Sequence, residues 1–508
     1  MVRLLKGGVR AVQLNVKTCP RSDDSRFGSA FKANLRIVKA MLHGLFFVPT
    51  AKKKRSVVLH LQNAFEQISH LSPASYKLAI YAAAYGLAAI AHKGFGVLLF
   101  FGLAHGLPSS EYARFGLLYA LQTGLITIAT AGIVEVVIGQ HAMQVNQGEG
   151  RPLYEVGNGL FVWLLPLATL VGVGIYSGFL LDYATVWDFL LILTGAGLLA
   201  FFMLQATFFR LEEAHRPSLL LSFVPPVMGL ALAYGVFLVW GTLTSFFGGM
   251  AVALLVMFGM LHWQGLIHVR ANLRVSNLVF VRQELPPYIL IGLLLWVTGY
   301  GSTYLVESFF NLAYVAKFTF AYTLSSALQL VATALNQVWS PRFFRLINAQ
   351  PADQLERRNV LFYGWMGVVM GVVGGGLLIL LRPAIDLFGG QLRSYRDITH
   401  GLDWLFAGYI VSIPWWHAQN YFYAHKEGGA LLKRVSMATG LGLFAWVGLM
   451  LVLQEAGIYL GFCGLMLIRS LAVFEYAHKR WGIRLAWHGP ALGGGLLLAG
   501  RLIGDRLG

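Results

Sequence analysis

The strongest candidates for chemistry are the ionisable side chains that fall inside long apolar runs. Lys93, with His92 beside it, lies near the middle of the run 78–104, where inserting a lysine costs about 2.5–3.5 kcal/mol. Charges inside a membrane normally face a watery cavity or a partner. We therefore expect Lys93 and His92 to form a cationic patch in a central cavity that holds a phosphate-bearing headgroup. The structural alternative is that Lys93 pairs with Glu135 or another acid inside the bundle.

Two further charges lie within apolar runs. Glu135 lies toward one end of the run 116–138. It is either the carrier of a coupling H⁺ or Na⁺ or a carboxylate at the level of the lipid headgroups. Arg469 lies deeper, within 457–476. Its guanidinium could reach either a cavity or, by snorkelling, the cytoplasmic interface, and we expect the interface.

A cluster of aromatic and amide side chains follows Pro414 in the run 402–423. The candidate residues in it are Trp416, His417, Gln419 and Asn420. Aromatic faces beside amides suit sugar binding, because amides both donate and accept hydrogen bonds. The alternative is an aromatic belt at the membrane interface, where Trp and Tyr gather as anchors. Pro414 is expected to bend the helix.

Two stretches of the chain, 113–131 and 316–334, align without a gap and share several identical residues. Arg114 and Lys317 occupy matching places in them. A duplicated set of membrane helices is a common architecture of secondary transporters, with the substrate path between the halves. We expect Arg114 and Lys317 at the outer mouth, either as a paired gate or as ordinary solvated helix starts.

The composition is that of a membrane protein. The 508 residues are 57% hydrophobic and 12% charged, whereas a soluble domain carries about 25% charged residues. Twelve apolar runs have spanning length. Their approximate bounds are 78–104, 116–138, 159–181, 189–209, 218–240, 243–262, 286–304, 318–340, 359–381, 402–423, 435–453 and 457–476.

Lysines and arginines concentrate in alternate loops, which places both termini in the cytoplasm. The sequence predicts an all-α polytopic membrane protein with about twelve transmembrane helices, in two six-helix lobes related by a pseudo-two-fold axis along the membrane normal. The predicted parts are a basic cytoplasmic tail 1–77, with or without an interfacial helix, an N-terminal lobe 78–262, a cytoplasmic linker 263–285, a C-terminal lobe 286–480 and a cytoplasmic or interfacial tail 481–508. Within the last part, the Gly-rich stretch 485–503 is expected to lie at the interface; if it spans, the C-terminus lies outside.

The sequence lacks the residues that several kinds of chemistry require. Cys19 and Cys463 are the two cysteines, too few for a disulfide framework or a cysteine metal site. The chain has no Walker motif and no His-Glu-x-x-His motif. We expect no metal and no cofactor. The net charge of +17 is concentrated in the N-terminal tail and the cytoplasmic loops, and we expect no nucleic-acid partner. The tail is either a helix that lies on anionic lipid or, as we expect, a disordered tail or an overextended start with Met41 as the initiator.

The stretch 106–116 resembles the Gly-Pro-x-x-Tyr-Gly turn between the first two spans of polysaccharide flippases. Residues 321–324 and 334–342, with their Pro-Arg ending, are similar to span eight of these proteins, and 456–462 is similar to the start of span twelve. Over the predicted spans the chain thus resembles the Wzx-type (O-antigen and exopolysaccharide) flippases of the multidrug/oligosaccharidyl-lipid/polysaccharide exporter superfamily. It departs from them at 301–303, which is Gly-Ser-Thr where many relatives carry Asp-Arg.

The resemblance implies a transporter, not an enzyme, in the bacterial cytoplasmic (inner) membrane. Its substrate would be a polyprenyl-diphosphate-linked oligosaccharide, flipped from the inner to the outer leaflet by alternating access. Cations such as Lys93 would hold the diphosphate, the prenyl tail would stay in the lipid bilayer, and an antiported H⁺ or Na⁺ would drive the cycle. A glycan polymerase and other assembly proteins are the expected protein partners.

Two other functions fit parts of the sequence. One is a cation-coupled drug or small-solute exporter of the same superfamily, which would be expected to have a more acidic cavity. The other is a membrane-embedded glycan polymerase or acyltransferase that uses His92 or His417, although the chain lacks clustered acid and base groups.

Overall fold

The computed structural model describes residues 94–133, 153–212, 214–271, 275–347, 349–425 and 427–507. All of them belong to the compact unit Tyr81–Gly508. The regular structure in these residues is helical, without a strand. The predicted tail 1–77 and the predicted site residues His92, Lys93 and Glu135 lie outside the described residues.

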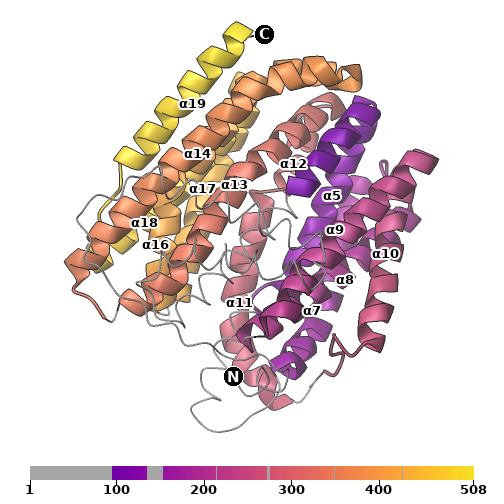
Figure 1. The fold of residues 1–508 in the computed structure, drawn as a ribbon, viewed down its shortest axis with the longest axis horizontal. Coiled ribbons are helices and arrows are strands. Elements are labelled where there is room, and N and C mark those ends of the chain that lie inside the picture. Colours follow the sequence, from indigo (N-terminus) through magenta and orange to yellow (C-terminus); the bar gives the residue numbers. More distant parts are fainter. Residues whose placement is uncertain are drawn as a thin grey trace, which may run out of the picture. The chain divides into compact units, whose positions relative to one another are not determined.

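Long apolar helices build both halves of this unit. After a short helix, Gly94–Gly106, the first half contains α5 (Ser109–Thr130), α7 (Leu153–Ile175), the π-helix η1 (Tyr176–Leu180), α8 (Val186–Leu211), α9 (His215–Trp240) and α10 (Leu243–Trp263). The second half contains α11 (Val275–Val297), α12 (Ser302–Phe309), α13 (Leu312–Leu346), α14 (Ala352–Phe388), the 3₁₀ helix η2 (Gly390–Ile398), α15 (Thr399–Val411), α16 (Ile413–Ala424), α17 (Gly428–Leu453), α18 (Glu455–Trp481) and α19 (His488–Leu507). Figure 1 shows their arrangement.

These helices correspond to the predicted apolar runs, and two of the runs are broken. By length and composition, eight of the described helices can cross a membrane, or nine if the bent pair α11–α12 counts as one span. A bend of 45° splits the run 286–304 between α11 and α12, and the run 402–423 is split just before Pro414, in the first turn of α16. The interruption expected at Pro414 is confirmed. Proline fits the first turn of a helix, where its missing N–H would have no partner within the helix. α11 begins at Val275, inside the predicted linker 263–285.

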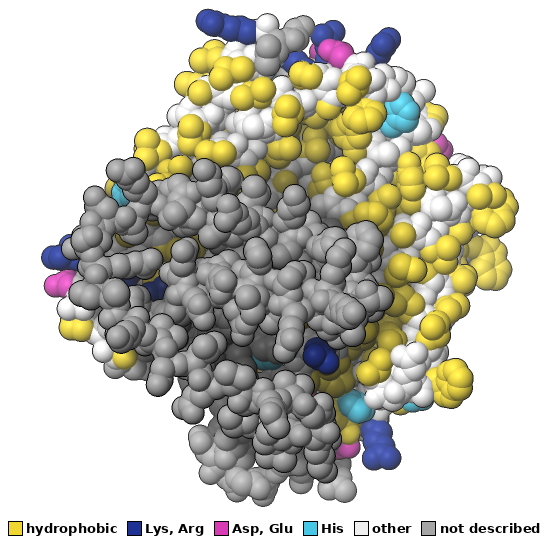
Figure 2. Space-filling view, viewed as in Figure 1, with side chains coloured by type: hydrophobic (Ala, Val, Ile, Leu, Met, Phe, Trp, Pro, Cys, Tyr) yellow, Lys and Arg dark blue, Asp and Glu magenta, His cyan; other side chains and the backbone are white. Residues whose placement is uncertain are grey.

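The outer surface of the helices is apolar. On the face drawn in Figure 2, hydrophobic side chains cover the flank where α9 and α10 lie, and charged side chains gather toward the margins. Exposed hydrophobic residues on α9 and α10 include Leu232, Val252, Leu255, Val256 and Met260. A large exposed apolar surface marks contact with a partner or a membrane, and the length of these helices fits the hydrocarbon layer.

The helices pack in two lobes that meet through the duplicated helices. α5, α7, α8, α9 and α10 pack on one another in the first lobe, and α13 to α18 do so in the second. α5 and α13, which carry the duplicated stretches, pack directly against each other, and Gly116 of α5 contacts Thr319 of α13. These two positions correspond in the duplication, as a two-fold axis between the helices requires. The predicted fold class, a helical polytopic protein with two related lobes, is confirmed.

α19 adds a helix to the C-terminal lobe and lies alongside α14 (Figure 1). The two helices run parallel and touch through glycines. The pairs are Gly367 with Gly489, Gly371 with Gly493, and Gly375 with Gly500. Small residues let the backbones of membrane helices approach closely, and the 20 residues of α19 cover about 30 Å, the thickness of a bilayer core. This packing along α14 favours the alternative in which 485–503 spans the membrane, although α19 is not among the eight helices that qualify as spans by length and composition. The expected interfacial placement stays a prediction.

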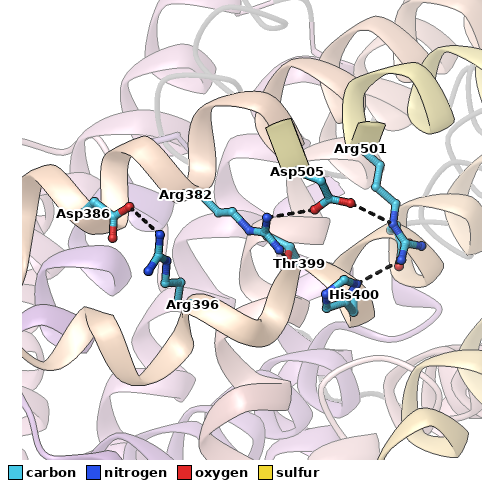
Figure 3. A network of polar contacts seen from close by, with 8 residues as sticks. Arg382, Asp386, Arg396, Thr399, His400, Arg501 and Asp505 are labelled. Atoms are coloured by element: carbon cyan, nitrogen blue, oxygen red, sulfur yellow. Dashed lines mark hydrogen bonds and ion pairs between the residues drawn. The ribbon is translucent and has the colours of Figure 1, made fainter. Parts of the chain in front are cut away.

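An ionic network joins the last turns of α14 and α19 to η2 and the start of α15 (Figure 3). Arg382 lies between Asp505, at 2.9 Å, and the hydroxyl of Thr399, at 3.1 Å. Arg501 pairs with Asp403 and, at 3.7 Å, with Asp505. The remaining contacts are Arg501 with His400 and Arg396 with Asp386. The end of α19 thus lies at the same end of the lobe as the loop between α14 and α15.

Because α19 runs parallel to α14, we expect it to cross the membrane. Alkaline phosphatase, whose disulfides form only outside the cytoplasm, should be active when fused after Leu507 and inactive when fused after Gly482. Green fluorescent protein at the same two places should give the opposite pattern. Phosphatase activity that is the same at both positions would show that α19 does not cross.

Candidate functional site between the lobes

The broken span α11–α12 lies where the two lobes meet. α11 packs on α5 of the first lobe and on α17 of the second. The break falls at residues 298–301, and a Cβ on Gly301 would lie 2.9 Å from the carbonyl oxygen of Trp296. A Cβ on Gly299 would lie 3.0 Å from the hydroxyl of Tyr322. A side chain on Gly301 would collide with the backbone, and one on Gly299 would be a tight fit, so the Gly-Tyr-Gly sequence favours a helix break here.

Tyr300, between these two glycines, is wedged between the duplicated tyrosines. Its ring centroid lies 5.2 Å from that of Tyr119 in α5 and 4.9 Å from that of Tyr322 in α13, edge to face in both cases. Tyr409 of α15 extends the row by donating its hydroxyl to that of Tyr322 at 3.3 Å. Edge-to-face pairs contribute about 0.5–1.5 kcal/mol each. The row of tyrosines therefore links the two lobes through the broken span.

Arg469 of α18 is a buried cation beside this break. The residue is 6% exposed. Its Nη1 donates to the Thr298 hydroxyl at 3.0 Å, and its guanidinium carbon lies 5.3 Å from the centre of the Trp415 ring. Among the described residues, no carboxylate forms an ion pair with it. The expectation that Arg469 snorkels to the interface is wrong, because the side chain turns into the bundle, where a hydroxyl and an aromatic face receive it.

Matching faces of α5 and α13 carry half-buried hydroxyl groups. On α5 these are Thr123 and Thr130, and on α13 the corresponding residues are Ser326 and Thr333. Each hydroxyl donates to a carbonyl of its own helix and keeps the capacity to accept a bond. Helical spacing places them on the same faces as Tyr119 and its duplicate. These faces therefore lie toward the axis between the lobes.

The lobes also touch where α5 begins. The hydroxyl oxygens of Ser109 in α5 and Ser394 in η2 are 3.4 Å apart. The ring centroids of Tyr112 and Tyr395 are 5.8 Å apart. In this conformation the lobes are in contact at the end of the molecule that carries η2.

Arg114 and Lys317, the predicted outer gate, are each bound inside their own lobe. Arg114 donates to the carbonyl of Tyr183 at 2.8 Å and pairs with Glu111 at 2.8 Å. Lys317 lies 3.4 Å from the Glu455 carboxylate. The structure gives each cation its own carboxylate and does not join the two, so their paired role at a gate stays a prediction.

The predicted sugar-binding cluster is packed inside the C-terminal lobe. His417 and Asn420 are each 1% exposed, and Asn420 donates to the hydroxyl of Tyr363 in α14 at 2.8 Å. In this conformation their placement does not support sugar contact, because their side chains join helices of one lobe. Trp416 and Gln419 are half-buried, and their role in sugar binding stays a prediction.

Thr298 and Tyr300 were not among the site residues predicted from the sequence. A Gly-Tyr-Gly sequence inside an apolar run was the available sign of a helix break. The roles expected for Lys93, His92 and Glu135 stay predictions, since these residues lie outside the described ones. Within the part of the chain that the structure describes, no group of three His, Cys, Asp or Glu side chains could hold a metal.

No protein-family model and no curated protein matches the sequence. Solved structures match the fold. An inward-facing multidrug resistance MATE family transporter of the MOP superfamily is similar with a TM-score of 0.58 at 14% identity, over 78% of this chain and 98% of that one. The Vibrio cholerae MATE transporter VcmN is similar with a TM-score of 0.54 at 16% identity, over 80% of this chain and 96% of that one.

The chain has the MATE transporter fold. This fold consists of twelve transmembrane helices in two lobes, in agreement with the predicted architecture. The proteins that share it here are membrane transporters and not enzymes, as the sequence analysis expects of this chain. At such low identity the likeness shows the arrangement of the helices and not the substrate.

Gly301→Ala is expected to destabilise the broken span by about 1–3 kcal/mol. The added methyl group would lie 2.9 Å from backbone atoms of Trp296 and Val297, which cannot give way as a flexible side chain would. The purified variant should unfold at a lower temperature. Gly235→Ala is the matched control, because nothing lies within 4 Å of that position in α9. Unfolding temperatures that are equal for both variants would show that the break accepts a side chain.

Proposed function

We propose that the chain flips a polyprenyl-diphosphate-linked oligosaccharide from the inner to the outer leaflet of a bacterial cytoplasmic membrane by alternating access. The observation that carries this proposal is Arg469, a buried guanidinium beside the broken span without an ion pair to a described carboxylate. Burying a charge costs several kcal/mol unless it is compensated. A diphosphate supplies the missing negative charge and accepts the two parallel hydrogen bonds of a guanidinium.

Arg469 lies close to the position at which many flippases carry an arginine. At 301–303, where many relatives carry Asp-Arg, this chain has Gly-Ser-Thr. Arg469 of α18 brings a guanidinium to the same break through its bond to Thr298. This supports a headgroup site whose arginine comes from another helix.

The other parts of the site have separate roles in this proposal. The half-buried hydroxyls on the matching faces of α5 and α13 would bind the sugars, while the prenyl tail stays in the bilayer. Lys93 and His92 would add positive charge for the diphosphate, and Glu135 would carry a coupling H⁺ or Na⁺. A glycan polymerase and other assembly proteins would receive the product in the outer leaflet.

The main alternative is a cation-coupled drug or small-solute exporter. It is favoured by one observation, namely that a multidrug resistance transporter shares the fold. A buried guanidinium repels cationic solutes and attracts anions. The charge of Arg469 therefore supports the lipid-linked diphosphate over a cationic drug.

Alternating access requires the contact between Ser109 and Ser394 to open during the cycle. Ser109→Cys combined with Ser394→Cys should form a disulfide, since the two hydroxyl oxygens are 3.4 Å apart. In a protein whose Cys19 and Cys463 are replaced by serine, we expect oxidation to stop transport and reduction to restore it. Each single-cysteine variant is the control and should transport under both conditions. Full transport by the cross-linked protein would contradict opening at this end.

Arg469→Ala should reduce flipping about ten- to hundred-fold, because a hydrogen bond to a charged group contributes about 1.5–3 kcal/mol. The assay uses proteoliposomes that contain a fluorescent polyprenyl-diphosphate oligosaccharide and an impermeant reagent that reports its leaflet. Arg469→Lys should retain part of the rate. Lys479→Ala is the control on the same helix, since the Lys479 side chain is 72% exposed.

Two results would contradict the proposal. One is normal flipping by an Arg469→Ala protein that is present in normal amounts. The other is covalent change of the lipid-linked glycan by the protein in detergent, where there are no leaflets, which would indicate a polymerase or transferase instead.

A further inference from the structure

Another buried charged group lies inside the C-terminal lobe. Glu356, near the start of α14, is 7% exposed. Its Oε1 accepts the backbone N–H of Arg484 at 2.5 Å, and its Oε2 accepts the hydroxyl of Tyr421 at 2.8 Å. The carboxylate is therefore held where α14, α16 and the segment between α18 and α19 meet.

His417 of α16 faces this carboxylate without completing a hydrogen bond. Its Nε2 lies 3.5 Å from Oε2 of Glu356, and the residue is 1% exposed. Among the described residues, neither ring nitrogen has a partner in hydrogen-bond geometry, although a buried polar group without a hydrogen bond costs about 1–3 kcal/mol. The Tyr363 ring stacks on the imidazole at 4.8 Å. An unpaired imidazole held beside a carboxylate is suited to take up a proton.

The groups that touch the pair are neutral. Those from α14 and α16 are Tyr363 and Tyr421, and Phe474 of α18 lies against the imidazole with ring centroids 6.1 Å apart. Other titratable and charged groups on the surrounding elements include Arg342 of α13, Asp353 of α14, Tyr409 of α15, His425 after α16, Arg434 of α17, Arg469 and His478 of α18, and Arg484, whose guanidinium pairs with Asp353. Arg357 and Arg358 follow Glu356 directly in α14, and both are exposed. Glu356 is therefore the charged group that would interact directly with a protonated His417.

We propose that His417 and Glu356 form a proton-binding site whose occupancy changes the contacts between α14 and α16. Without the proton, the pair carries one negative charge, and Oε2 of Glu356 bonds Tyr421. A proton taken from hydronium in the surrounding water binds an imidazole nitrogen and neutralises the pair. The protonated imidazole of His417 then donates a charge-assisted hydrogen bond to Oε2 of Glu356, in competition with the hydroxyl of Tyr421.

Hydrogen bonds connect this site to α13, the duplicated helix at the lobe interface. The hydroxyl of Tyr421 accepts from Asn359 Nδ2 at 3.0 Å, and Asn359 Oδ1 accepts from Trp339 Nε1 at 3.0 Å. A change at Glu356 is thereby passed through Tyr421 and Asn359 to α13. The site would make the packing of the C-terminal lobe respond to pH, whichever substrate the protein carries.

The test is a pH titration of the full-length protein in nanodiscs, with ¹³C-labelled histidine and without substrate. We expect one signal that changes with pH and is missing from His417→Gln. In Glu356→Gln this signal should remain, with the proton affinity reduced about ten-fold or more, because the imidazolium loses its carboxylate. His425→Gln removes an exposed histidine at the end of the same helix and should leave the signal unchanged.

Hydrogen–deuterium exchange of the unmodified protein is a second measurement, which needs no variant to fold. After correction for the intrinsic effect of pH, exchange in 352–363 and 413–424 should differ between about pH 6 and about pH 8. A His417 signal that does not titrate, or exchange that is the same at both pH values, would overturn the proposal. Neither result bears on the flippase proposal, because that is tested by lipid transport.

Discussion

The close contact between the two duplicated helices is the constraint on which the rest of the structure depends. Where Gly116 of α5 meets Thr319 of α13, any side chain on the glycine would collide with the threonine. Small residues are the usual means by which membrane helices approach this closely, because lipid supplies no hydrophobic drive for helices to associate. The contact turns matching faces of α5 and α13 toward one axis. Tyr300 lies between Tyr119 and Tyr322 of the same two helices and so contacts both lobes.

The burial of Arg469 follows from the broken span. Thr298, at the end of α11, donates its hydroxyl to the carbonyl of Leu294 at 2.9 Å and accepts from Arg469 at 3.0 Å. The arginine is thereby tied to the backbone of the helix that breaks. The guanidinium donates a hydrogen bond to the Thr298 hydroxyl and lies over the Trp415 ring. Both contacts stabilise the positive charge, but neither neutralises it. An anionic ligand would complete the site.

The C-terminal lobe is reinforced at both ends. At one end, glycine contacts between α14 and α19 lead to the network around Arg382 and Arg501 (Figure 3). Isolated surface ion pairs contribute little, but these share residues and link three helices. At the other end, Glu356 and Tyr421 connect α14 to α16. A lobe tied in this way can move as a unit, which rocking about the axis between the lobes requires.

The membrane helices, their duplication and the break before Pro414 could be predicted from the amino-acid sequence. Apolar runs must satisfy their own backbone groups inside lipid, so they become helices whatever their neighbours are. The inward turn of Arg469 and the bonds of Asn420 within one lobe depend on contacts between helices and could not be predicted from the sequence. The position of a residue along an apolar run does not show which neighbouring helix provides a hydroxyl, an amide or an aromatic ring for its side chain to contact. The same holds for the packing of α19 on α14 through glycines of both helices, because contacts between helices distant in sequence depend on both surfaces at once.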